Sequence, residues 1–121
     1  NDVARDSESK KGPSKALGDF EDNYRQILDW TREISAHIIL SEAFFLAEED
    51  VAKRGFRVDP YNAIICELAR EYKARYVPLD WAFRQAKMKR PDRVWTTGDD
   101  VHPNPVGHTL IALQVLRAFG W

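Results

Sequence analysis

The chain has 121 residues, a length that suits one domain with a hydrophobic core. Hydrophobic residues make up 44% of the chain and charged residues 31%, which is the composition of an ordinary soluble globular protein. The formal net charge is -1, which does not favour nucleic acid as a partner. No apolar run approaches the length of a membrane span, the N-terminus lacks the features of a signal peptide, and a single cysteine excludes an intrachain disulfide.

The hydrophobic pattern predicts alternating helices and strands. In chain order the predicted elements are a flexible loop over 1–15, a helix over 17–34, a strand over 37–41, a helix capped by Asp59, a strand over 75–79, a short helix over 81–88 capped by Asp80, and a final helix that begins at Pro105 with Asn104 as its N-cap. This alternation favours an α/β fold with three layers, α/β/α, in which strands 37–41 and 75–79 are parallel and adjacent. Two parallel strands leave an edge unpaired, so we expect further strands in the complete domain.

A loop near the C-terminus carries the most informative pattern. Asp99 precedes His102 by three positions in Asp-Asp-Val-His-Pro-Asn. An imidazole that accepts a proton from a nucleophile, oriented by a carboxylate, forms two members of a hydrolytic triad. The spacing alone also fits a turn in which Asp99 is a cap and His102 a surface histidine.

The segment from Trp95 to Asn104, followed by Gly107-His108, resembles the last conserved block of the SGNH/GDSL hydrolases, which is written D-x-x-H and commonly DGVHPN. The resemblance implies a flavodoxin-like parallel sheet, with Asp99 as the triad acid and His102 as the general base. Asp100 stands where glycine is usual in that block, which adds a negative charge to the loop.

The start of the chain, Asn1-Asp2, resembles the second half of the G-x-N-D block of the same family. The resemblance implies that Asn1 donates a hydrogen bond in the oxyanion hole. In this family the nucleophilic serine precedes that asparagine, whereas Ser7 follows it in a polar segment. We therefore expect residues 1–121 to be the C-terminal portion of one SGNH hydrolase domain. Its partner would be an N-terminal portion that carries the serine and the oxyanion-hole glycine.

The predicted function is a serine ester hydrolase without a cofactor, acting on a short acyl ester, a lysophospholipid or an acetylated sugar. Phe44 and Phe45 lie after the first strand, at the end of the sheet where α/β proteins bind ligands, and they fit either an acyl pocket or a satellite core. Two alternatives stay open. One is a non-catalytic α/β module with a relic Asp-His loop. The other is a metal site made of Asp99, His102 and His108, which lacks a recognised ligand spacing, so no metal is expected.

Overall fold

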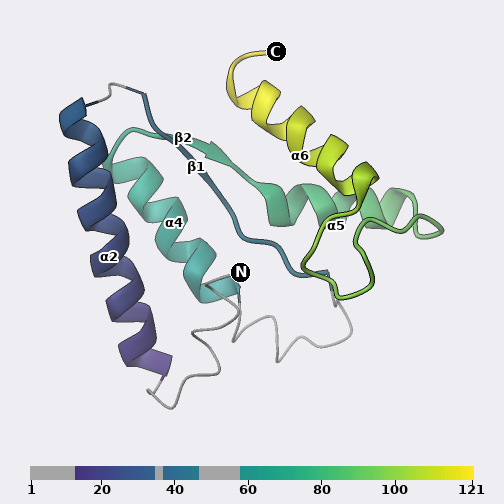
Figure 1. The fold of residues 1–121 in the computed structure, drawn as a ribbon, viewed down its shortest axis with the longest axis horizontal. Helices are drawn as coiled ribbons and strands as arrows, with labels where there is room; N and C mark the ends of the chain where they lie inside the picture. Colours follow the sequence, from purple (N-terminus) through teal and green to yellow (C-terminus); the bar gives the residue numbers. More distant parts are fainter. Residues whose placement is uncertain (1–12, 35–36, 47–57) are drawn as a thin grey trace.

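The computed structural model describes residues 13–34, 37–46 and 58–121 (Figure 1). In chain order these residues form helix α2 (Pro13–Ile34), strand β1 (Ile39–Ser41), helix α4 (Asp59–Glu71), strand β2 (Arg75–Val77), helix α5 (Leu79–Lys89) and helix α6 (Pro105–Ala118). None of these helices is long and apolar enough to cross a membrane.

Strands β1 and β2 pair in parallel, with Leu40 opposite Tyr76. Helix α4 connects them, as parallel strands require a crossover. The prediction that the two strand segments are parallel and adjacent is therefore confirmed. Each strand has three residues, which is shorter than the predicted runs over 37–41 and 75–79. The second strand ends before Pro78 because a proline cannot donate to the ladder.

The sheet has a helical layer on each face (Figure 1). Helix α4 contacts both strands, and α6 contacts β2. Side chains alternate between the faces of a strand. Leu40 and Tyr76 accordingly pack with α4, whereas Arg75 faces the other way and donates a hydrogen bond to the carbonyl oxygen of Ala118 at the end of α6. The chain thus has the predicted α/β/α layering.

The main buried cluster joins α2, β1 and α4, which explains why α2 lies beside α4 (Figure 1). Its buried members are Leu28, Leu40, Ile65, Leu68 and Ala69. Burying one Leu or Ile side chain stabilises a fold by roughly 1.5–3 kcal/mol. The apolar contacts of this cluster hold α2 against α4.

Three helix starts differ from the sequence prediction. Helix α2 begins at Pro13, inside the segment expected to be loop, because proline suits the first turn of a helix. Helix α4 has Val58 at the N-cap position and no side-chain cap, so Asp59 is its first residue rather than its cap. Helix α5 begins at Leu79, and Asp80 lies in its first turn.

The side chain that binds the first turn of α5 comes from elsewhere in the chain. Glu42, directly after β1, accepts hydrogen bonds at Oε2 from the backbone N–H groups of Asp80 at 2.9 Å and Trp81 at 3.3 Å. The Asp80 side chain is buried, and its Oδ1 accepts from the backbone N–H of Phe45 at 3.2 Å. The predicted Asp80 cap was therefore wrong because a distant carboxylate occupies that role.

Candidate active site

Backbone pairing joins the two ends of the 95–104 loop, residues 95–97 and 102–104, here called its neck. Thr96 and Pro103 form an isolated antiparallel bridge, and the N–H of Thr97 donates to the carbonyl oxygen of His102 at 2.8 Å. The N–H of Asn104 donates to the carbonyl oxygen of Trp95 at 3.1 Å. These bonds bring residues 95–97 beside residues 102–104, so residues 98–101 form the tip of the loop.

Asp99 organises the tip of the loop and holds the histidine. Its Oδ1 accepts from the backbone N–H groups of Val101 at 3.2 Å and His102 at 2.9 Å. Its Oδ2 pairs with Nδ1 of the His102 ring. The hydrogen bond from the His102 side chain, followed by that from the His102 backbone, lowers the pKa of Asp99 to about 2. Asp99 is therefore ionised at neutral pH and positioned to orient the imidazole and to stabilise its protonated form.

Both side chains of this pair are accessible, with 46% of Asp99 and 53% of His102 exposed. Such exposure leaves both side chains accessible to other reacting groups. The two residues predicted as acid and base are thus brought together, although the roles themselves stay predictions.

The backbone conformation at Asp100 explains why glycine is usual at this position of the motif. Its φ of 63° lies in the left-handed region that favours glycine. Aspartate is among the residues that tolerate this conformation best. The carbonyl oxygen of Asp100 accepts from the N–H of Leu46 at 3.0 Å, so the loop is tied to the segment that leaves β1.

The start of α6 supports the loop from its other end. Asn104 is the N-cap as predicted, since its Oδ1 accepts from the N–H of Gly107 at 2.9 Å. Its Nδ2 donates to the carbonyl oxygen of Val94 at 2.8 Å. A Cβ on Gly107 would lie 2.3 Å from the carbonyl oxygen of Trp95, so only glycine fits without displacing the neck of the loop.

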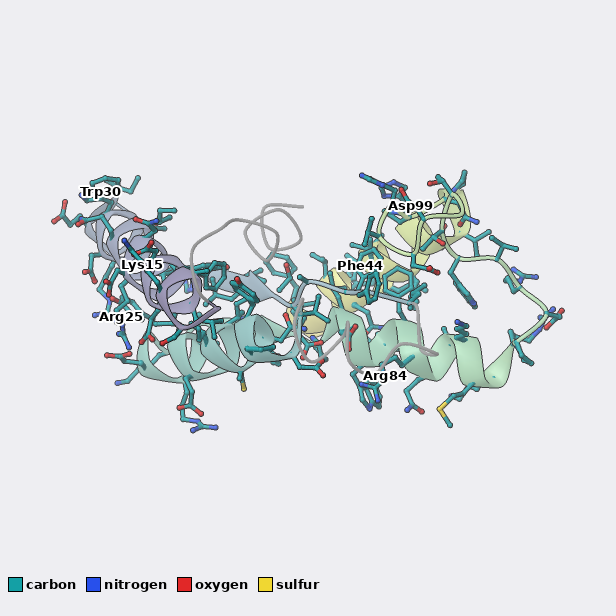
Figure 2. The ribbon with its side chains drawn as sticks, turned by 90° about the horizontal axis from the view of Figure 1, so that it is seen from below. Lys15, Arg25, Trp30, Phe44, Arg84 and Asp99 are labelled. Carbon is teal, nitrogen blue, oxygen red and sulfur yellow. The ribbon has the colours of Figure 1, made fainter. Side chains whose placement is uncertain are left out.

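Residues 42–46, here called the strap, run from the end of β1 to the 95–104 loop. Figure 2 shows Asp99 and Phe44 at the same end of the molecule, with Arg84 on the opposite side of α5. Phe45 is 6% exposed, and the ring of Phe44 stacks on that of Phe83 with centroids 4.2 Å apart. This packing favours a supporting role for both rings, and their contact with substrate stays a prediction.

The remaining predicted site residues fall into two groups. Asn1 lies outside the described residues, so its place in an oxyanion hole stays a prediction. His108 is exposed in the first half of α6. Among the described residues no three His, Cys, Asp or Glu side chains are grouped so that they could hold a metal ion, which gives the three-ligand alternative no support.

Sequence reasoning missed the side chains that fix the strap. Asn62 of α4 accepts from the N–H of Ala43 at 3.0 Å and donates to its carbonyl oxygen at 2.8 Å. The ammonium of Lys87 donates to the carbonyl oxygen of Leu46 at 2.9 Å. The only hint in the sequence is that Asn62 interrupts an otherwise apolar helix face, and Lys87 gives no signal at all.

The sequence matches one family model along most of its length. The model of the GDSL-like Lipase/Acylhydrolase family matches residues 1–110. An acetylxylan esterase from Geobacillus stearothermophilus is 28% identical over 107 residues, which are 87% of this chain and 48% of that protein. The chain therefore spans about half the length of the curated relative that it matches.

Solved structures have the same fold. A protein from Parabacteroides merdae described as a GDSL-like lipase superposes with a TM-score of 0.76 at 29% identity, covering 86% of this chain and 50% of that one. The Geobacillus stearothermophilus acetylxylan esterase superposes with a TM-score of 0.72 at 25% identity, covering 87% and 48%. Further structures of that esterase are described as catalytic mutants, in which a serine, an aspartate or a histidine is replaced by alanine. The aspartate and the histidine stand three positions apart, as Asp99 and His102 do here.

Proposed function

Because the chain belongs to the GDSL-like lipase/acylhydrolase family, we propose that it supplies the acid and the base of a serine ester hydrolase. The observation that carries the proposal is the pairing of Asp99 with Nδ1 of His102 on an exposed loop. With Nδ1 engaged by a carboxylate, Nε2 is the nitrogen that accepts a proton in a Ser-His-Asp triad. The ionised state of Asp99 at neutral pH supports this assignment.

In the proposed reaction a serine hydroxyl attacks the carbonyl carbon of an ester while Nε2 of His102 takes the hydroxyl proton. The tetrahedral oxyanion collapses, the C–O bond to the leaving alcohol breaks, and His102 returns the proton to that alcohol. Water then attacks the acyl-serine, with His102 again accepting and returning one proton. Throughout the cycle Asp99 stabilises the transient imidazolium without itself being protonated.

The nucleophile belongs to a segment outside this sequence in our proposal, as does the oxyanion-hole glycine. In the family order the serine precedes the Asn block, and no serine precedes Asn1 here. In the Geobacillus esterase the serine lies farther ahead of the aspartate than this chain extends ahead of Asp99. Asn1 is proposed to donate to the oxyanion beside that glycine.

For the substrate we propose an O-acetyl ester of a saccharide. The relative at 28% identity is an acetylxylan esterase. The packing of Phe44 and Phe45 against other side chains leaves less room for a long acyl chain at the strap. Both considerations favour a small acyl group over the lysophospholipid that the sequence left open.

The test uses the full-length protein that carries this chain, with p-nitrophenyl acetate and acetylated xylo-oligosaccharides as substrates. His102→Ala should lower kcat by about three orders of magnitude or more, because the serine loses its proton acceptor. His108→Ala is the matched control, since it removes an exposed histidine from the adjacent helix. Both variants should stay folded, and the loss of the half-exposed Asp99–His102 pair in His102→Ala should lower the unfolding temperature only slightly.

The isolated 121-residue chain should show no turnover of p-nitrophenyl acetate. Near-normal turnover in His102→Ala would refute the role of His102. Enzyme-like turnover by the isolated chain would refute a nucleophile supplied from outside it. An inactive parent would favour the non-catalytic module with a relic Asp-His loop.

A further inference from the structure

The strap is held by side chains from two helices. Asn62 of α4 brackets Ala43 through the two hydrogen bonds described above, and Oδ1 of Asp80 accepts from the N–H of Phe45. Glu42 binds the first turn of α5 in return. The strap and α5 are therefore joined at the beginning of both segments.

Lys87 makes the connection at the other end of the strap. Its side chain is half-buried, and its Nζ donates to the carbonyl oxygen of Leu46 at 2.9 Å. Asp80 and Lys87 are seven positions apart on α5, which places them two turns apart on one face of the helix. One helix face thus holds both the N–H of Phe45 and the carbonyl oxygen of Leu46.

Leu46, the strap residue that Lys87 binds, also binds the tip of the 95–104 loop. The N–H of Leu46 donates to the carbonyl oxygen of Asp100 at 3.0 Å. Asp100 is the residue with positive φ between the proposed acid and the proposed base. A residue other than glycine keeps this backbone conformation only where its surroundings hold it. The Asp100 carbonyl shares its peptide group with the N–H of Val101, which donates to Oδ1 of Asp99 at 3.2 Å, so the orientation of this carbonyl is coupled to the Asp99 side chain.

From this chain of contacts we infer that Lys87 is a positioning residue for the proposed reaction. It acts through Leu46 and the Asp100 carbonyl on the geometry of the Asp99–His102 pair, and it touches neither side chain of that pair. The inference rests on the proposed function for its kinetic consequence. Its structural consequence is independent of the serine, because the Asp99–His102 pair lies wholly within this chain.

The experiment compares three variants of the full-length protein. Lys87→Met keeps most of the aliphatic stem and removes the ammonium that binds Leu46. Lys89→Met is the matched control, because it removes an exposed lysine from the same turn of α5. Lys87→Arg restores a cationic donor that can reach the same carbonyl oxygen. Circular dichroism confirms the fold, and Lys87→Gln replaces Lys87→Met if that variant does not fold.

Two measurements are made on each variant. With p-nitrophenyl acetate, Lys87→Met should lower kcat by roughly 10- to 100-fold with little change in KM, since a displacement of about 1 Å in a positioning group costs that much. In the proton NMR spectrum the low-field signal of the His102 Nδ1–H, the signature of its bond to Asp99, should weaken or shift in Lys87→Met. Lys89→Met should match the parent in both measurements, and Lys87→Arg should recover most of kcat.

The outcomes separate the two proposals. If the parent turns over the ester and Lys87→Met equals Lys89→Met in kcat and in the Nδ1–H signal, the positioning role is refuted while the proposed function stands. A rise in KM without a fall in kcat also refutes it, because the lysine then acts on substrate binding. If the parent is inactive, the proposed function fails, and the Nδ1–H signal alone decides whether Lys87 positions the pair.

Discussion

Replacing Gly107 by alanine tests whether the start of α6 and the neck of the 95–104 loop are as closely packed as the structure indicates. The added Cβ would lie 2.3 Å from the carbonyl oxygen of Trp95, 3.0 Å from Cβ of Pro103 and 3.4 Å from Cε1 of Phe83. Real Cβ atoms do not approach within 3.0 Å, so the Trp95 carbonyl must move by about 0.7 Å or more. This carbonyl accepts from the N–H of Asn104, and its displacement weakens the bond that closes the loop.

The expected cost follows from three contributions. Overpacking of a close contact costs about 1–3 kcal/mol. A weakened hydrogen bond adds about 0.5–1.5 kcal/mol. Alanine recovers about 0.8–1 kcal/mol because it is a better helix former than glycine. We therefore expect Gly107→Ala to lower the free energy of unfolding by about 1–3 kcal/mol.

Urea denaturation followed by circular dichroism measures this free energy. Gly18→Ala is the matched control, since Gly18 lies in α2 and, among the described residues, no atom outside the neighbouring backbone of its own helix lies within 4 Å of the position of its added Cβ. That substitution should raise the free energy of unfolding by about 0.8–1 kcal/mol. If Gly107→Ala were as stable as the parent, or stabilised like Gly18→Ala, the close approach of the loop to α6 would be wrong.

Three further predictions concern the same loop. Asn104→Ala removes the N-cap of α6 and should lower the free energy of unfolding by about 1 kcal/mol in urea, whereas Asn104→Ser, which retains a capping oxygen, should lose less. Asp100→Val places a β-branched residue at positive φ and should cost about 1–2 kcal/mol in the same assay, whereas Asp100→Gly should cost nothing; equal effects would contradict the left-handed conformation. The third follows from the pKa of Asp99, which the bonds from His102 lower to about 2 from an ordinary value near 3.8. A lowered folded-state pKa means that ionised Asp99 stabilises the fold above about pH 4 and that this contribution is lost as the pH falls towards 2. The stability difference between the parent and Asp99→Asn should therefore shrink over that interval, and a difference independent of pH would show that the pairing is absent.

The Asp99–His102 arrangement couples a closed turn to an exposed histidine ring. The carboxylate uses Oδ1 to close the turn on the backbone and Oδ2 to hold the ring, so one side chain sets both the loop and the tautomer of the histidine. Because the turn and the ring both depend on Asp99, a substitution at Asp99 should affect the conformation of the loop as well as the proposed chemistry. His102→Ala separates the two effects, since it leaves the bond from Asp99 Oδ1 to the backbone in place.

Local chemistry explains which features could be predicted from the sequence. The cap of α6 and the Asp99 turn each form within a few residues of the chain, and the residue types that make them are the ones that prefer those positions. Alternation of helices with short apolar runs was sufficient for the parallel α/β arrangement. The resemblance of the 95–108 segment to a family block then assigned the acid and the base, and the family itself was confirmed over residues 1–110.

Contacts between segments far apart in the chain were decided only by the tertiary structure. Glu42 binds the first turn of α5 in the role predicted for Asp80. Lys87 of α5 donates to the carbonyl oxygen of Leu46 in the strap. Gly107 is required by a carbonyl oxygen of the preceding loop rather than by a turn of its own. Periodicity and capping rules describe a residue by its neighbours along the chain, whereas these bonds depend on how α5, the strap and the loop are packed against the sheet.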